Sequence, residues 1–88
     1  MIEQAVEITN SLGLHARPAA QFVRTASGFA SEVVVVVDGA EINGKSIMGV
    51  MMLAAECGSS LVIRTRGADE VEALAAMVNL VHNGFGEA

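Results

Sequence analysis

The sequence contains no tryptophan and no tyrosine, and it has one cysteine and one proline among 88 residues. The lone cysteine, Cys57, has no partner for a disulfide within the chain, so we expect a protein of a reducing compartment. Aromatic residues make up 3% of the chain, so a core must be built from aliphatic side chains and methionine. The hydrophobic fraction of 52% favours such a core over disorder.

Basic residues are also scarce, with 5 Lys and Arg against 10 Asp and Glu. A surface that binds phosphate backbones needs clustered cations, so nucleic acid is not an expected partner. No apolar run reaches the roughly 18 residues that span a bilayer, and the first ten residues do not resemble a secretory signal. We expect a cytoplasmic protein without membrane insertion, folded as one domain over 1–88.

The spacing of apolar residues predicts both strands and helices. Alternating positions indicate half-buried strands, and apolar residues three and four apart indicate helices with one buried face. The expected elements are a strand at 2–8, a helix at 16–27, a hairpin with an Asp-Gly turn across 32–43, a helix at 46–54, a strand at 60–66 and a helix from 69 to about 84. This β-α-β-β-α-β-α order predicts an α+β fold, with helices packed over one largely antiparallel sheet.

The last predicted helix carries a start signal of its own. Asp69 and Glu72 have the spacing of a capping box, in which two side chains bind the free N–H groups of the first turn. The expected buried face consists of Val71, Leu74, Val78 and Val81. Gly84 marks the expected end of the helix.

The segment LGLHARPAAQF, residues 12–22, places His15 where an amphipathic helix begins. The start of a helix has free N–H groups and the positive end of the dipole, so it favours anions, phosphate above all. Pro18 is tolerated in the first turn, and Arg17 adds a cation whose donors suit phosphate oxygens. A neutral imidazole is a nucleophile, so this pattern indicates a histidine that carries a phosphoryl group.

Two other interpretations of His15 remain open at this point. A surface histidine in a loop before a helix needs no function at all. A metal ligand needs further ligands, and only His82 and Cys57 are of a suitable type. No ligand spacing links them to His15, so we expect no metal and no cofactor.

Two motifs together, GLHARPA at 13–19 and NGKSIMGVMML at 43–53, strongly resemble the HPr family of histidine-containing phosphocarriers. These are components of the bacterial phosphoenolpyruvate-dependent phosphotransferase system. The resemblance covers essentially the whole chain. It implies an open-faced β-sandwich, a four-stranded antiparallel sheet with three helices on one face, in a cytoplasmic monomer.

The resemblance also assigns roles at the start of the first helix. His15 matches the histidine that phospho-enzyme I phosphorylates at Nδ1, and an enzyme IIA domain then takes the phosphoryl group. Arg17 matches the residue that assists the transfer, and the backbone N–H of Ala16 lies beside it at the helix start. The protein itself is modified in each half-reaction, so we expect a carrier rather than an enzyme.

The second motif places Ser46 just before an apolar helix. The sequence alone favours an N-cap, in which the hydroxyl binds a free N–H of the first turn. In the family, Ser46 matches a serine phosphorylated by HPr kinase/phosphorylase. A phosphate there adds a charge near −2 beside apolar residues, which would weaken docking if those residues bind a partner.

The methionine-rich helix after Ser46 has two interpretations. Its residues could all be buried under neighbouring helices, or some could form an adaptable contact surface. The resemblance favours the second, with Val50 and Leu53 inside. The expected partner-binding residues are Ala20, Arg24, Ile47, Met48 and Met51.

A rival function comes from a different class of protein. It is a regulatory module in which phosphorylated Ser46 and the apolar surface bind a transcription factor or a kinase. Paralogues of that kind lack the histidine, so the presence of His15 argues against it. The branch of the phosphotransferase system stays open, because Asn10 and Leu12 resemble nitrogen-related carriers while GKSIMGVM resembles serine-regulated ones.

Overall fold

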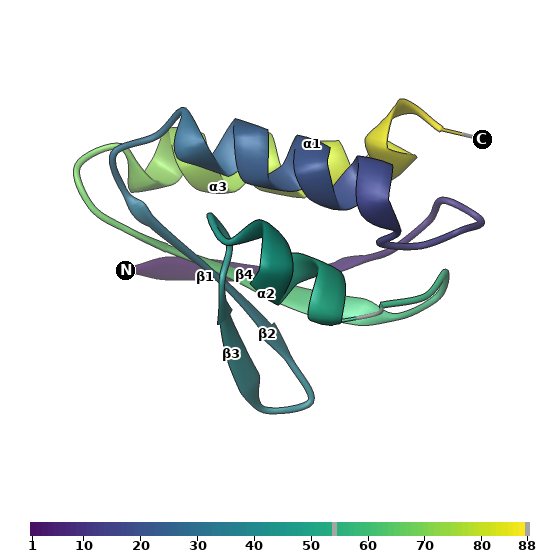
Figure 1. Cartoon of the computed structure of the whole chain (residues 1–88). Helices are drawn as coiled ribbons and strands as arrows, with labels where there is room; N and C mark the ends of the chain where they lie inside the picture. Colours follow the sequence, from purple (N-terminus) through teal and green to yellow (C-terminus); the bar gives the residue numbers. More distant parts are fainter. Residues whose placement is uncertain (54, 88) are drawn as a thin grey trace.

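The computed structural model describes residues 1–53 and 55–87. Its elements are β1 (Ile2–Glu7), α1 (Ala16–Ser27), β2 (Glu32–Val37), β3 (Ala40–Asn43), α2 (Ile47–Met52), β4 (Ser60–Arg66), α3 (Glu70–His82) and a short 3-10 turn, η1 (Gly84–Gly86). The strands form one antiparallel sheet in the order β1-β4-β2-β3. The helices lie on one side of this sheet (Figure 1), which confirms the predicted open-faced α+β sandwich.

The core lies between the sheet and the helices. Leu61 and Ile63 of β4 alternate with more exposed neighbours and are fully buried, as are Phe22 of α1 and Met77 of α3. The two central strands, β2 and β4, therefore turn one row of side chains inward, while the edge strand β3 has no buried residue. Aliphatic residues supply most of this core, in keeping with the scarcity of aromatics.

The β2–β3 hairpin confirms the Asp-Gly turn. Asp38 and Gly39 both have positive φ, 51° and 81°, between the paired residues Val37 and Ala40. A two-residue turn with both residues left-handed matches the twist of the strands it joins.

The predicted capping box of α3 is wrong. Asp69 does occupy the N-cap position, but its side chain makes no cap hydrogen bond. Its carboxylate instead accepts hydrogen bonds from the backbone N–H groups of Ala30 and Ser31, both at 2.9 Å, and from the Ser31 hydroxyl. The connection between α1 and β2 competes successfully for this acceptor, so Asp69 joins two loops.

The predicted buried face of α3 is also partly wrong. Val71 is 65% exposed, while Leu74 and Val81 are buried as expected. The face that meets the sheet runs through Ala73 and Met77, and Val71 lies to one side of it because a helix turns once in about 3.6 residues. The small Ala73 gave no sign in the sequence that it would be a core position.

The second helix is shorter than expected. It begins after Ser46, as predicted, and ends at Met52, while Ala54 lies outside the described residues. Gly49 allows its close approach to the sheet, because a Cβ there would lie 2.8 Å from a methyl carbon of Ile42. None of the described helices is long and apolar enough to span a membrane.

Candidate functional site

The loop before α1 rests on the segment that follows α2. The N–H of Leu14 donates to the carbonyl oxygen of Ala55 at 2.8 Å. Gly13 has a φ of +67°, and a Cβ on it would lie 2.3 Å from that same oxygen. Only glycine fits this close approach, so Gly13 determines how the next residues enter the helix.

His15 is the N-cap residue of α1, but its side chain makes no cap hydrogen bond. Its backbone is extended, and its carbonyl accepts the N–H of Ala19 at 3.0 Å. The N–H groups of Ala16 and Arg17 precede this first helical bond, and Pro18 has none to satisfy. At the start of α1, these N–H groups have no partner among the described residues, and they lie beside an imidazole whose side chain is 35% exposed.

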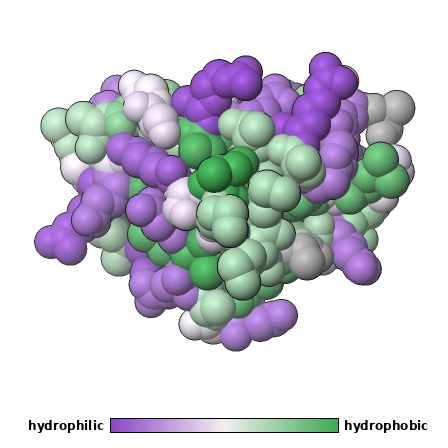
Figure 2. All heavy atoms as spheres, viewed as in Figure 1, coloured by the Kyte–Doolittle hydropathy of each residue, from purple (hydrophilic) through white to green (hydrophobic). Residues whose placement is uncertain are grey.

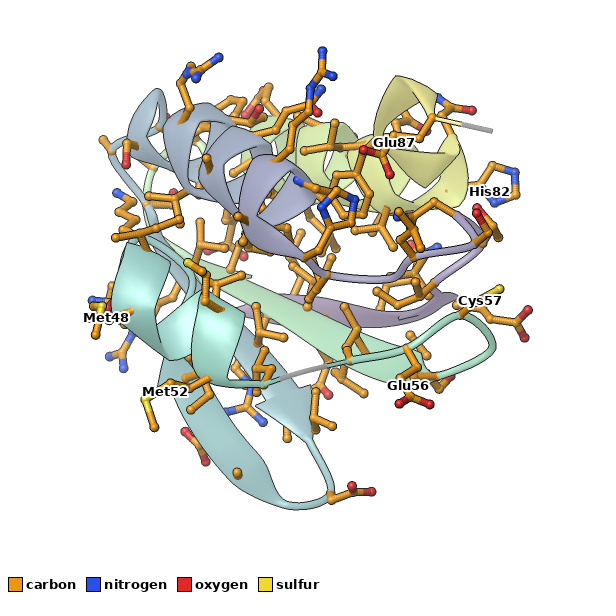
Figure 3. The ribbon with its side chains drawn as sticks, turned by 45° about the vertical axis from the view of Figure 1, so that its right-hand side comes forward. Met48, Met52, Glu56, Cys57, His82 and Glu87 are labelled. Atoms are coloured by element: carbon orange, nitrogen blue, oxygen red, sulfur yellow. The ribbon has the colours of Figure 1, made fainter. Side chains whose placement is uncertain are left out.

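Glu87 contacts the imidazole from the other end of the chain. Its Oε1 lies 3.1 Å from His15 Nε2 and accepts a hydrogen bond from Asn10 Nδ2 at 3.0 Å. Figure 3 shows Glu87 in the turn after α3, with its carboxylate directed toward the start of α1. The hydrogen bond from His15, with smaller contributions from Asn10 and Arg17, holds the pKa of Glu87 below its usual range.

Sequence reasoning missed Glu87 entirely. The two residues are 72 positions apart, so no local spacing connects them. The flanking residues of Phe85 are both glycine, which is typical of a tight turn, but that pattern does not say what the turn faces.

A pocket of about 610 Å³ lies along the outer side of α1 and the turn after α3. It is lined by Arg17, Ala20, Gln21, Arg24, Phe85, Gly86 and Glu87. The predicted site residue Arg17 and the predicted contact residues Ala20 and Arg24 thus share one surface. Among the described residues neither arginine forms an ion pair, so both keep their charge available for an anionic group.

Ser46 is the N-cap residue of α2, and here the side chain does cap. Its Oγ accepts the N–H of Gly49 at 3.2 Å, and its carbonyl accepts the N–H of Val50 at 2.9 Å. The predicted N-cap is confirmed. The residue is half-buried, and its hydroxyl faces the first turn of the helix.

The exposed residues of α2 form an apolar surface, here called the α2 patch. It consists of Ile47, Met48, Met51 and Met52, whose exposed fractions are 38%, 68%, 43% and 78%. Figure 2 shows a green area over α2 that is bordered by hydrophilic residues. The predicted outward positions of the first three residues are confirmed. Val50 is buried and Leu53 is half-buried against the core, while Met52 is a member that the sequence analysis missed.

The remaining candidate residues do not join the site. Cys57 and His82 both point outward (Figure 3), and the Cys57 Sγ lies 3.8 Å from the carbonyl oxygen of Thr9. Across residues 1–53 and 55–87, no three His, Cys, Asp or Glu side chains gather as metal ligands would.

Comparison with known proteins identifies the family of this chain. The family model for the phosphorylation site of the HPr component of the phosphotransferase system matches residues 2–83. The phosphocarrier protein HPr of Neisseria meningitidis serogroup A is 52% identical over 87 residues, which cover 99% of this chain and 98% of that one. The crystal structure of HPr-C-His from Thermoanaerobacter tengcongensis has 48% identity and a TM-score of 0.95, covering 100% of this chain and 99% of that one.

Fold, site and relatives together define a small phosphocarrier domain. The chain belongs to the HPr family of the phosphotransferase system. A further structure from Thermoanaerobacter tengcongensis, an HPr dimer, has 48% identity and a TM-score of 0.79 and covers 99% of this chain and 100% of that one. That relative is a dimer, whereas we expect this chain to be a monomer, so the monomer stays a prediction.

Proposed function

We propose that His15 accepts a phosphoryl group from phospho-enzyme I, itself charged by phosphoenolpyruvate, and passes it to an enzyme IIA domain in the cytoplasm. The observation that carries this proposal is the geometry at the start of α1. An imidazole there has one ring nitrogen, Nε2, against Glu87, while the other, Nδ1, has no partner among the described residues. Nδ1 is then the nitrogen available for bond formation.

The transfer balances without any further reactant. The lone pair of Nδ1 forms the bond to phosphorus, and the bond from phosphorus to the donor breaks with its electron pair returning to the donor. The N–H groups of Ala16 and Arg17 and the Arg17 guanidinium supply donors for the phosphoryl oxygens. In the second half-reaction the acceptor on enzyme IIA attacks, and the electron pair of the N–P bond returns to Nδ1.

Partner docking uses two adjoining surfaces in this proposal. The α2 patch supplies apolar area, and Ala20 and Arg24 extend the contact along α1. Flexible methionines adapt to more than one partner, which a carrier with a donor and an acceptor requires. The positive charge of Arg17 and Arg24 on a chain of net charge −5 favours acidic surfaces on those partners.

Ser46 is proposed as a regulatory phosphorylation site for an HPr kinase/phosphorylase. Its position at the start of α2 tolerates a phosphate, because the helix dipole favours negative charge there. The same phosphate would lie next to Ile47 and close to the rest of the α2 patch. Its desolvation on docking would oppose the apolar contact, so phosphorylation of Ser46 should reduce phosphoryl transfer to His15.

Phosphoryl transfer in vitro tests the proposal. The protein is mixed with phosphoenolpyruvate, Mg²⁺ and enzyme I, and acid-labile phosphate is measured on the wild type and on His15→Ala. We expect about one phosphate per wild-type chain and none on the variant. Equal labelling of both proteins, or none on the wild type, would contradict the proposal.

A further inference from the structure

The contact between Glu87 and His15 determines which ring nitrogen carries a proton. An ionised carboxylate accepts hydrogen bonds and donates none, so a nitrogen that faces it at 3.1 Å must be the N–H of the ring. The lowered pKa of Glu87 indicates that this carboxyl group is ionised at neutral pH. The proton therefore lies on Nε2, and the lone pair lies on Nδ1.

Asn10 holds the carboxylate in this position. The side chain of Asn10 is 1% exposed, and its Nδ2 donates both to the carbonyl oxygen of Gly13 at 2.8 Å and to Glu87 Oε1 at 3.0 Å. One amide group thereby ties Glu87 to the loop that carries His15. Glu87 Oε1 accepts hydrogen bonds from both Asn10 and His15, and these two bonds together hold the oxygen next to the imidazole.

The turn before Glu87 has an uncommon backbone. Gly84, Phe85 and Gly86 have consecutive positive φ values of 62°, 57° and 75°. A bulky residue is strained in this region, yet Phe85 occupies it and is 4% exposed within the core. The burial of Phe85 anchors the turn, and the turn brings Glu87 back toward the start of α1.

We propose that Glu87 is a positioning residue that keeps the proton of His15 on Nε2, so that the phosphoryl group enters and leaves Nδ1 without any proton transfer. When Nδ1 forms the N–P bond, the ring becomes an imidazolium that retains its Nε2–H, and the carboxylate of Glu87 pairs with this charge. When the N–P bond breaks, its electron pair returns to Nδ1 and the ring is again neutral with the same Nε2–H. This catalytic consequence rests on the proposed function, while the proton position does not.

The test measures the tautomer in the full-length, unphosphorylated protein. Histidine labelled with ¹⁵N is observed by NMR above the titration range of imidazole, in the wild type, Glu87→Gln and Glu87→Ala. We expect the Nε2–H form to dominate in the wild type. The Nδ1–H to Nε2–H ratio should rise about fivefold in Glu87→Gln, because a charge-assisted bond is about twice as strong as a neutral one, and at least as much in Glu87→Ala, which removes the acceptor.

Two references accompany this measurement. His82, which is exposed, gives a second signal in the same spectrum and should not change. Glu72→Gln removes the same charge from the exposed side of the first turn of α3 and should leave His15 unchanged. An unchanged His15 tautomer in both Glu87 variants would overturn the proposal, however the wild type behaves with enzyme I.

A second measurement separates this proposal from the proposed function. The rate of labelling by enzyme I should fall about fivefold in Glu87→Gln, with the KM for enzyme I unchanged, because the imidazolium loses its charged partner. A shifted tautomer with an unchanged rate would overturn the catalytic role of Glu87. Absence of labelling on the wild type, with the Nε2–H form intact, would overturn the proposed function and leave the tautomer assignment standing.

Discussion

The starts of α1 and α2 are built from the same local element and are used in opposite ways. At α2, the Ser46 hydroxyl accepts the N–H of Gly49 and so satisfies one of the free donors of the helix. At α1, the His15 side chain makes no such bond and contacts Glu87 instead, so no described side chain caps the N–H groups of the first turn. The start of α2 is closed by its own cap, while the start of α1 is left open, as the proposed phosphoryl carrier requires.

The largest effect should come from breaking the loop that opens α1. Gly13→Ala forces a Cβ to within 2.3 Å of the Ala55 carbonyl at a positive φ, so we expect a loss of about 3 kcal/mol of unfolding free energy. Gly39→Ala is the matched control, because Gly39 has a φ of +81° with nothing within 4 Å of the added Cβ. It should cost about 1 kcal/mol. Urea unfolding followed by circular dichroism measures both, and equal losses would mean that close contact does not matter at Gly13.

Variants of Arg17 and Arg24, both on α1, distinguish an effect on the transfer step from an effect on docking. Arg17→Gln should lower the maximal rate of His15 labelling about tenfold, because the guanidinium stabilises charge on the transferring group. Arg24→Gln lies two turns further along α1 and should mainly raise the KM for enzyme I, by about threefold at low salt. Steady-state labelling over a range of enzyme I concentrations distinguishes the two. Identical effects of both variants would show that Arg17 contributes only general charge.

The caps themselves can be compared by paired truncations. Ser46→Ala removes the cap of α2 and should cost about 1 kcal/mol of unfolding free energy. His15→Ala removes no cap and only a partly exposed pair with Glu87, so it should cost less than about 0.5 kcal/mol. Chemical denaturation measures both losses. A larger loss for His15→Ala would contradict the distinction between a closed and an open helix start.

The α2 patch can be weakened without disturbing the cap beside it. Met48→Ser should raise the KM for enzyme I about fivefold and leave the maximal labelling rate unchanged, because Met48 is 68% exposed and contributes apolar contact area. Val71→Ser is a matched control on α3, with 65% exposure. Equal KM values for the two variants would remove the α2 patch from the docking surface.

The start of α3 differs from those of α1 and α2, because its N-cap residue, Asp69, makes the unfolding free energy depend on pH. The Ser31 hydroxyl, and after it the Ala30 N–H, hold the pKa of Asp69 below its usual range. A carboxyl group with a lowered pKa in the folded state stabilises the fold at higher pH and loses this contribution as the pH falls through its folded pKa. Unfolding free energy should therefore decline below about pH 4, and less steeply in Asp69→Asn. Asp38→Asn, in the exposed β2–β3 turn, is the control and should keep the steeper, wild-type decline of unfolding free energy. If its decline is as shallow as that of Asp69→Asn, the pH dependence does not come from Asp69 in particular.

Local pattern was sufficient to predict the elements that local interactions control. The Asp-Gly turn and the N-cap Ser46 both follow from residues within one turn of one another, whereas the buried position of Val50 was expected only from the family resemblance. The start of α1 belongs to the same group, because Pro18 and the amphipathic spacing that follows it are local signals.

Prediction from the sequence failed where residues distant in the chain bind the same group. Asp69 had the spacing of a capping residue, but the N–H groups of Ala30 and Ser31 bind its carboxylate from another loop. Glu87 is the strongest case, since its contact with His15 depends on the whole fold. No window of sequence contains both partners of such a contact, so periodicity and spacing cannot reveal it.

The joining of His15 to Glu87 has a consequence for how the protein is made. Synthesis proceeds from the N-terminus, so the histidine leaves the ribosome long before the residue 72 positions later that completes its surroundings. Contacts of such high sequence separation close late in folding, because the intervening chain must first be ordered. A nascent chain that already displays its histidine would still lack the partner of Nε2. Full reactivity would then begin only after residue 87 has been added and has reached the histidine.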